Sequence, residues 1–333
     1  MVFRALVTDK DASGAVQSRV EQVAETRLPD GNVTVAVEWS GLNYKDALCI
    51  SGLGNLVRLY PHIGGIDFSG RVLESTDARF HPGQAVVLTG WRVGEVHWGG
   101  FAQRARVNAD WLVPLPRKIS TRTAMMLGTA GLTAMLAVNR LKGEGLAAGD
   151  GEILVTGAGG GVGSIAVMLL SRLGYKVAAL TGRAALADQL IRLGASRIVS
   201  RDEMLQPTGK ALDKETWAAA IDPVGGPLLG EVLKKIRYGG AAIAIGGVGG
   251  LNWDASVIPF ILRNVALFGI DSVMQPHGAR VAAWDRLSTL FVPTAYEELT
   301  SEARLEELPD LAARMLKGAV AGRVLINPRD PPT

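Results

Sequence analysis

Residues 152–163, which read EILVTGAGGGVG, constrain the fold of this chain more than any other segment. A short apolar run is followed by a glycine-rich turn and then by a helical pattern that extends to Leu173. The glycines at 157, 160 and 163 lack a Cβ, so the backbone there can approach a pyrophosphate. The helix that follows directs its unpaired N–H groups and positive dipole end at that anion. A glycine motif between a strand and a helix predicts a dinucleotide site, with contacts from Gly159, Gly160, Gly161, Val162 and Gly163.

The end of the next apolar run, residues 174–180, indicates which dinucleotide is bound. NAD-binding proteins usually carry Asp or Glu about 20 residues beyond the glycines, where it binds the ribose 2′-OH. Here Thr181, Gly182 and Arg183 occupy that place, and the first acid is Asp188. A guanidinium can hold a 2′-phosphate bidentately, and a hydroxyl can donate to it. We therefore predict NADPH rather than NADH; the alternative is that Arg183 is a solvated loop arginine.

Composition restricts the class of protein. With 333 residues, 48% hydrophobic side chains and 41 glycines, the chain suits a two-domain α/β protein with many tight turns. The net charge is +3 and the basic residues are dispersed, so we expect no nucleic-acid partner. The most apolar stretch, residues 153–180, is interrupted by glycines, Arg172 and Lys176, so we expect no membrane span. The first residues show no signal-peptide pattern and Cys49 is the single cysteine, so we expect a cytoplasmic protein.

The pattern changes along the chain. Up to about residue 118, short β-type runs alternate with glycine turns, which is typical of a compact barrel-like β domain. Between residues 153 and 270 strands and helices alternate, which predicts a doubly wound parallel sheet. The tail returns to a helix and ends in a strand at residues 322–326. We expect residues 1–122 to begin the catalytic domain, 123–270 to bind the dinucleotide, and 271–333 to complete the first domain.

Several motifs together resemble the medium-chain dehydrogenase/reductase superfamily over essentially the whole chain. They are residues 41–46 (GLNYKD), 64–70 (GGIDFSG), 82–86 (PGQAV), the glycine turn and 193–195 (LGA). The resemblance implies an α/β fold class, with a GroES-like β-rich catalytic domain and a Rossmann dinucleotide-binding domain. More narrowly, residues 43–46, 181–183, 200–201 and 259–263 (PFILR) resemble the NADPH-dependent acryloyl-CoA reductase group, once grouped with quinone oxidoreductases.

The zinc branch of this superfamily has an early cysteine, a His-Glu pair and often a four-cysteine lobe. Here Ile66 and Asp67 stand at the His-Glu position, and the four histidines lack ligand spacing. We expect no metal; a site assembled from distant Asp and His residues is the alternative. Alcohol oxidation would lack a zinc ion to stabilise the alkoxide. Reduction of an activated C=C bond needs no metal, because the substrate carbonyl accepts the charge.

The expected reaction transfers a hydride from NADPH to Cβ of an alkene conjugated to a thioester, after which Cα is protonated. Tyr44 is the first candidate for the donor to the developing enolate or for a nicotinamide-positioning group; a packed tyrosine is the alternative. Asn43 and Asp46 complete the predicted catalytic set, although they are equally explained as a helix N-cap and its first-turn charge. The resemblance also implies cofactor contacts by Arg201, Gly247, Ser272 and Asn327.

The predicted substrate is acryloyl-CoA or a close short-chain 2-enoyl-CoA, reduced to the saturated acyl-CoA (propionyl-CoA). Arg263 and Arg323 are candidates for the CoA phosphates, and solvated surface arginines are the alternative. Two other functions stay open: an NADPH:quinone reductase and a non-catalytic NADPH-binding redox sensor. Residues 265–270 (VALFGI) form an apolar run late in the cofactor domain, where an exposed sheet edge would pair with a second copy. We expect a homodimer.

Overall fold

The computed structural model describes residues 1–206 and 208–330, which form two compact units. Unit 1 contains residues 1–132, residues 272–289 and the segment that begins at Leu299. Unit 2 contains Thr133–Asp271 and Leu290–Glu298. Each unit has its own sheets and its own apolar core.

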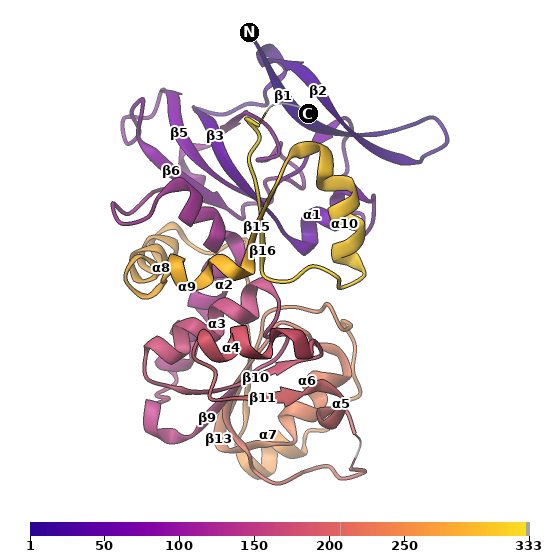
Figure 1. Ribbon diagram of the computed structural model, residues 1–333, viewed down its shortest axis with the longest axis vertical. Coiled ribbons are helices and arrows are strands. Elements are labelled where there is room, and N and C mark those ends of the chain that lie inside the picture. Colours follow the sequence, from indigo (N-terminus) through magenta and orange to yellow (C-terminus); the bar gives the residue numbers. More distant parts are fainter. Residues whose placement is uncertain (207, 331–333) are drawn as a thin grey trace. The chain divides into compact units, whose positions relative to one another are not determined.

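Unit 2 is built on a six-stranded sheet with the strand order β11-β10-β9-β12-β13-β14 (Figure 1). Every neighbouring pair in this sheet is parallel, as the alternation of strands and helices predicts. The central strand β12 is buried along its whole length, which explains its continuous apolar run. The strands are β9 (Glu152–Val155), β10 (Lys176–Thr181), β11 (Arg197–Ser200), β12 (Trp217–Asp222), β13 (Ile236–Ala244) and β14 (Ala266–Gly269).

Helices connect these strands. Helix α3 follows the glycine turn and buries eight consecutive residues from Gly163 to Leu170. A buried apolar cluster between the sheet and α6 includes Leu228, Val232 and Trp217. The helices of unit 2 are α3 (Gly161–Arg172), α4 (Ala187–Arg192), α5 (Arg201–Met204), α6 (Gly226–Leu233), α7 (Ile258–Arg263) and α9 (Pro293–Tyr296).

Unit 1 contains a three-stranded and a seven-stranded sheet. The small sheet has the order β2-β1-β4, and the large one has the order β15-β16-β3-β5-β6-β8, with β7 paired to β3. The strands are β1 (Val2–Lys10), β2 (Val16–Ala24), β3 (Val33–Leu42), β4 (His62–Ile63), β5 (Asp67–Ser75), β6 (Ala85–Thr89), β7 (Arg104–Val107), β8 (Leu112–Pro114), β15 (Thr300–Ala303) and β16 (Arg323–Ile326). The last strand, β16, pairs antiparallel with β3, so the end of the chain joins the sheet formed by its beginning. Its helices are α1 (Tyr44–Ile50), α8 (His277–Leu290) and α10 (Leu308–Leu316).

The chain passes from unit 1 to unit 2 within helix α2 (Thr121–Gly143), which is kinked at Gly128. The predicted domain boundary at residues 122/123 lies in the first turn of this helix, whereas the units divide after Leu132. Residues 290–298, which we expected in the return segment, belong to unit 2. Among the described residues α2 is also the one helix long and apolar enough to cross a membrane, and 83% of its apolar window is buried inside the protein.

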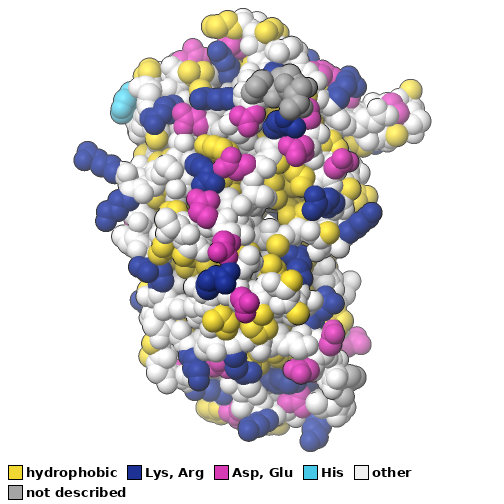
Figure 2. All heavy atoms as spheres, in the orientation of Figure 1, with side chains coloured by type: hydrophobic (Ala, Val, Ile, Leu, Met, Phe, Trp, Pro, Cys, Tyr) yellow, Lys and Arg dark blue, Asp and Glu magenta, His cyan; other side chains and the backbone are white. Residues whose placement is uncertain are grey.

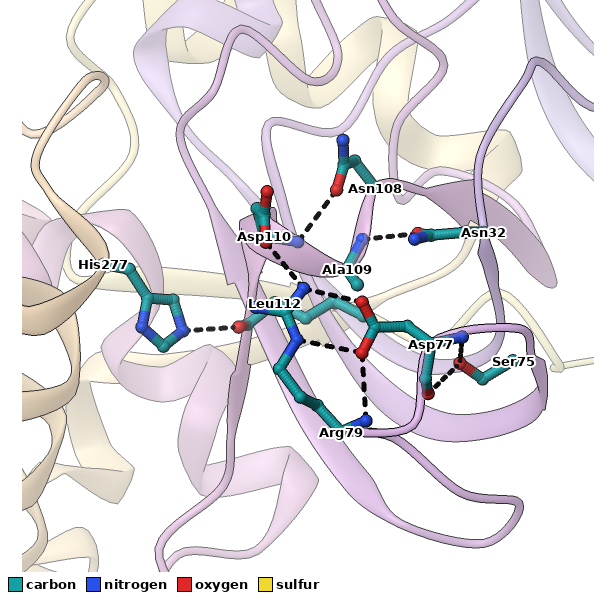
Figure 3. Close-up of polar contacts among 9 residues, drawn as sticks. All are labelled: Asn32, Ser75, Asp77, Arg79, Asn108, Ala109, Asp110, Leu112 and His277. Atoms are coloured by element: carbon teal, nitrogen blue, oxygen red, sulfur yellow. Dashed lines mark hydrogen bonds and ion pairs between the residues drawn. The ribbon is translucent and has the colours of Figure 1, made fainter.

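A polar network fixes the turns at one end of the large sheet of unit 1 (Figure 3). The guanidinium of Arg79 donates to both carboxylate oxygens of Asp77, at 2.9 and 2.7 Å, and to Asp110 at 2.6 Å. These bonds hold the pKa of Asp77 at about 2, because Arg79 stabilises the charged form. On the face that Figure 2 shows, basic and acidic side chains are interspersed, which is consistent with the dispersed charge of the sequence.

Candidate active site

The glycine turn of unit 2 joins the carboxyl end of β9 to the first turn of α3. Gly157 has φ +53°, a conformation that side chains rarely adopt, and a Cβ there would lie 2.9 Å from Val224 Cγ2. A Cβ at Gly163 would lie 2.4 Å from the Gly157 carbonyl oxygen, so the turn closes directly on the helix. The N-cap residue, Gly160, makes no side-chain capping bond. The N–H groups of this first turn are therefore suited to bind an anion.

A buried hydrogen-bond pair that the sequence reasoning missed supports this turn. The Thr156 hydroxyl donates to the carboxylate of Asp222, which also accepts from the Gly225 N–H at 2.7 Å. Burial raises the pKa of Asp222. One feature of the sequence indicated this pair: an acid, Asp222, ends the otherwise apolar strand WAAAID. The pair ties the ends of the neighbouring strands β9 and β12 together beside the glycines.

The predicted 2′-phosphate residues lie at the next two strand ends. Thr181 at the end of β10 is in register with Ser200 at the end of β11. The Thr181 hydroxyl oxygen accepts from the Arg183 N–H at 3.1 Å, which leaves the hydroxyl hydrogen free to donate to a ligand. A Cβ built on Gly159 would lie 3.3 Å from that oxygen, so the glycine turn adjoins this site.

Arg201 joins the same group of residues. It follows β11 directly, and its side chain is exposed. A Cβ built on Gly182 would lie 3.2 Å from Arg201 Cζ and 3.3 Å from its Nε, so the guanidinium packs against the backbone at Gly182. The structure therefore brings Thr181, Gly182 and Arg201 together, and glycine at 182 makes room for the arginine.

Gly247 lies at the same edge of the sheet, in the loop after β13. A Cβ on the adjacent Gly246 would lie 2.5 Å from the Pro223 carbonyl oxygen, so this loop packs closely against the end of β12. A Cβ on Gly247 itself would lie 2.5 Å from Leu251 Cδ2. The predicted cofactor residues of unit 2 thus share the carboxyl edge of its parallel sheet.

Arg263 lies away from this edge of the sheet, and its contact with substrate stays a prediction. Its Nη1 donates to the carbonyl oxygens of Lys234, at 2.8 Å, and Ile236, at 3.3 Å, and its Nη2 donates to that of Asp213. Ile236 begins β13, so the guanidinium lies at the amino edge of the sheet, opposite the glycine turn. Its side chain is 13% exposed, and it fixes the segment that leads into β13.

In unit 1, Asn43 and Asp46 form a capping box around the first turn of α1. Asp46 Oδ2 accepts from the main-chain N–H and the side-chain amide of Asn43, at 2.9 and 3.1 Å. Asp46 Oδ1 accepts from the N–H groups of Gly65 and Ile66, at 3.1 and 2.8 Å. Burial and the nearby charge of Asp67 raise the pKa of Asp46 to about 7, although the hydrogen bonds from Asn43 and Ile66 act to lower it. Asp46 is fully buried, and both of its carboxyl oxygens bond to protein groups, so its role in catalysis stays a prediction.

Tyr44 lies between these two residues in the sequence but faces outward. Its side chain is 39% exposed. Its hydroxyl has no hydrogen-bond partner among the described residues. The packed-tyrosine alternative requires a buried ring, and the ring of Tyr44 is exposed. The capping box therefore presents a free phenol on a fixed helix turn.

Arg323 is not a surface residue. It is 3% exposed; its Nη1 donates to Asn43 Oδ1 at 2.8 Å, and its Nη2 donates to the Met125 carbonyl oxygen at 3.3 Å. Nη2 also lies 3.7 Å from Asp67 Oδ2. The guanidinium is thus engaged by protein groups on several sides, and its contact with a CoA phosphate stays a prediction.

The two remaining predicted cofactor residues belong to unit 1. The Ser272 carbonyl oxygen accepts from the buried Arg280 at 3.1 Å. The Asn327 side chain bonds within its own turn, to Asp330 and to the Arg329 N–H, at 2.7 and 3.0 Å. Their contacts with a cofactor stay a prediction.

The described residues contain no group of three His, Cys, Asp or Glu side chains that could hold a metal ion. His97 Nε2 is hydrogen-bonded to the Arg106 carbonyl oxygen at 2.7 Å, and His277 Nε2 to that of Leu112 at 3.1 Å (Figure 3). Cys49 is buried, and burial raises the pKa of its thiol to about 12, so it is an unreactive core residue.

Comparison with known proteins extends these observations. Residues 29–117 match the family model of the alcohol dehydrogenase GroES-like domain, and residues 161–288 match that of the zinc-binding dehydrogenases. The chain is 54% identical to acrylyl-CoA reductase AcuI of Ruegeria pomeroyi over 98% of this chain and 99% of that protein.

Two solved structures are similar over nearly the whole chain. The YhdH oxidoreductase of Salmonella enterica, in complex with NADP, is 49% identical with a TM-score of 0.94, over 97% of this chain and 99% of that one. YhfP of Bacillus subtilis, solved with NAD bound, is 44% identical with a TM-score of 0.93, over 98% and 99%. The GroES-like and Rossmann fold class is confirmed, and the chain belongs to the medium-chain dehydrogenase/reductase superfamily.

Proposed function

We propose that the protein is an NADPH-dependent oxidoreductase that reduces the C=C bond of acryloyl-CoA, or of a close short-chain 2-enoyl-CoA, to the saturated thioester. The observation that carries the proposal is the guanidinium of Arg201 against Gly182, next to Thr181 and the glycine turn. The 54% identity to a protein named acrylyl-CoA reductase supports the substrate class.

The residues of unit 2 fit a dinucleotide with a 2′-phosphate. Cβ atoms at Gly157, Gly159 and Gly163 would each lie within 3.0 Å of a neighbouring protein atom, so the turn depends on glycine at these positions. A turn without these side chains lets the backbone approach a pyrophosphate. Thr181 supplies a hydroxyl donor, and Arg183 and Arg201 supply positive charge at the place where NAD-binding proteins carry an acid. When bound, NADPH supplies the hydride.

Tyr44 has the chemistry to assist the second half of the reaction. When the hydride reaches Cβ, the electron pair of the C=C bond moves toward the thioester, its oxygen becomes negative, and Cα then takes a proton. A phenol donates a hydrogen bond to such an oxyanion most effectively when it has no competing partner and a fixed position. The Tyr44 hydroxyl has no hydrogen-bond partner among the described residues, and the capping box fixes the helix turn that carries it.

Replacing Tyr44 with Phe tests this role. We expect kcat to fall by roughly 10- to 1000-fold, as is typical when an acid or oxyanion donor is lost. The melting temperature should stay the same, because the hydroxyl makes no internal bond and the ring remains. An unchanged rate of hydride transfer in single turnovers would remove Tyr44 from the mechanism.

Quinone reduction is the second candidate, because the similar YhfP of Bacillus subtilis carries a quinone oxidoreductase name. The two functions are separated by following NADPH oxidation with acryloyl-CoA, crotonyl-CoA and a benzoquinone side by side. We expect the highest kcat/KM with acryloyl-CoA. A higher value with the benzoquinone would reverse the assignment, and no turnover with any acceptor would favour the redox sensor.

We further propose that the protein is a cytoplasmic homodimer. In the described sheet of unit 2, β14 is an edge strand that pairs with β13 alone. Val257, Ile261 and Leu262, in and beside the helix that precedes it, are 66%, 67% and 60% exposed. An open edge next to apolar side chains favours pairing with a second copy. Light scattering should give twice the chain mass at micromolar concentration; a monomer would contradict the dimer. Cell fractionation tests the location.

A further inference from the structure

We propose that Asp67 and Arg323 are a buried positioning pair that fixes Tyr44 through the side chain of Asn43. The inference rests on the proposed role of Tyr44 in turnover. Asp67 begins β5, Arg323 begins β16, and Asn43 is the N-cap of α1; all three belong to unit 1 (Figure 1).

The two charges are placed in a space that glycines leave open. Asp67 is 0% and Arg323 3% exposed, and their closest side-chain atoms are 3.7 Å apart. A Cβ on Gly41 would lie 2.4 Å from Arg323 Nη2, and one on Gly128 would lie 2.6 Å from the same atom and from Asp67 Oδ2. Gly128 has φ +51° at the kink of α2. Two separate backbone segments therefore accommodate this one pair.

The pair controls the orientation of the Asn43 amide. Arg323 Nη1 donates to Asn43 Oδ1 at 2.8 Å, so the amide nitrogen must point the other way. There it donates to Asp46 Oδ2 at 3.1 Å and to the Gly41 carbonyl oxygen at 3.2 Å. Asn43 is thus held between the guanidinium of Arg323 and the carboxyl group of Asp46. Tyr44 is the next residue, so the position of its backbone depends on this bridge.

The other end of the pair is anchored on α2. Asp67 Oδ2 accepts from the Thr129 N–H at 2.7 Å, directly after the kink, and Arg323 Nη2 donates to the Met125 carbonyl oxygen. The pair therefore connects the kinked helix to the turn that carries Tyr44. Movement of one element would be transmitted to the other through rigid, short side-chain contacts.

The pair is poorly optimised for stability alone. Asp67 Oδ1 and Arg323 Nε are buried without a hydrogen-bond partner among the described residues. Buried ion pairs are weak stabilisers even when fully hydrogen-bonded, and apolar replacements often stabilise a protein more. The pair is bonded to Asn43, the residue before Tyr44, and its two unsatisfied atoms are better explained by the geometry that it imposes on this turn.

A double-mutant cycle on kcat tests the inference, with Arg323→Lys as the principal variant. Lysine keeps the charge but cannot hold Asn43 and Met125 with one planar group. We expect kcat to fall about 10-fold, as for a small misplacement of a reacting group, while KM for NADPH stays nearly constant. In a Tyr44→Phe background the same change should lower kcat by less than about twofold, because the positioned hydroxyl is already absent.

Asp67→Asn provides a second, isosteric variant in case the lysine variant does not fold, and the same loss of effect is expected in the Tyr44→Phe background. Arg122→Lys is the matched control. Arg122 also lies on α2, and it forms an ion pair with Glu302 in unit 1, at 2.7 Å. This control should keep the kcat of the unmodified protein.

The outcomes distinguish the role of Tyr44 from that of the Asp67–Arg323 pair. If Tyr44→Phe lowers kcat and Arg323→Lys lowers it by the same factor in both backgrounds, the pair is merely structural and the inference is wrong. If both pair variants keep full kcat, the inference is also wrong. If Tyr44→Phe itself keeps full kcat, the proposed role of Tyr44 fails and the positioning role fails with it.

Discussion

Removal of the Arg201 guanidinium should weaken NADPH binding selectively. In the structure this group packs against Gly182, within 3.2 Å of where a side chain would begin, and Thr181 lies at the adjoining strand end. No acid of residues 181–187 competes for it, since the first is Asp188. Arg201→Ala removes the charge and leaves the glycine turn unchanged.

The expected magnitude follows from the type of bond that is lost. A hydrogen bond to a charged group contributes about 1.5–3 kcal/mol. Because each 1.4 kcal/mol corresponds to a factor of ten in affinity, KM for NADPH should rise about 10- to 100-fold. KM for NADH should change less than about twofold, because NADH has no 2′-phosphate. Arg183→Ala should act in the same direction.

The assay is steady-state oxidation of both cofactors at saturating acryloyl-CoA, supported by titration of cofactor binding. Arg79→Ala is the control, because it also removes an arginine. The Arg79 side chain is 56% exposed and is bonded to Asp77 and Asp110 in unit 1. It should leave both KM values unchanged. Equal increases for NADPH and NADH in the Arg201 variant would refute the assignment of a 2′-phosphate site.

Three further predictions concern the turn, the buried acid and the metal. Gly163→Ala places a Cβ 2.4 Å from the Gly157 carbonyl oxygen and should abolish measurable NADPH binding in a fluorescence titration. Gly278→Ala is the control, because its Cβ meets nothing within 4 Å, and it should bind NADPH normally. Normal binding by the Gly163 variant would contradict the turn geometry. Because the pKa of Asp46 is raised to about 7, the folded state binds that proton more tightly than the unfolded state does. The free energy of unfolding should therefore fall as pH rises from about 4 to about 7, by up to about 4 kcal/mol, and stay level above that range. In urea unfolding, the Asp46→Asn variant should lose this part of the pH dependence. If its free energy of unfolding varies with pH as that of the unmodified protein does, the assignment to Asp46 is wrong. Finally, chelation should leave turnover intact, and stoichiometric zinc whose removal abolishes activity would overturn the metal-free reading.

Features fixed by local sequence were predictable. The glycine turn, the alternation of strands and helices in unit 2 and the capping box around Tyr44 each depend on residues close together in the chain. Short-range patterns of this kind report backbone geometry directly. Their predicted structures are found at those positions.

The roles of Arg263 and Arg323 could not be predicted in this way. Both were candidates for the CoA phosphates, with a solvated surface arginine as the alternative, since arginines are exposed in most proteins. Their actual environments depend on partners far away in the sequence: Arg323 contacts Asn43, 280 positions earlier. No local pattern distinguishes a buried arginine from a solvated one. The bond between Thr156 and Asp222 was missed for the same reason.

The destination of the hydride tests the central claim, conjugate reduction of an enoyl thioester, most directly. Acryloyl-CoA is reduced with NADPH that carries deuterium at C4 on one face or the other, and the product is analysed by mass spectrometry and NMR. We predict propionyl-CoA with one deuterium at Cβ from one of the two labelled cofactors. In deuterated water with unlabelled NADPH, one deuterium should appear at Cα. Deuterium from the cofactor at Cα, or no reduced thioester at all, would contradict the account.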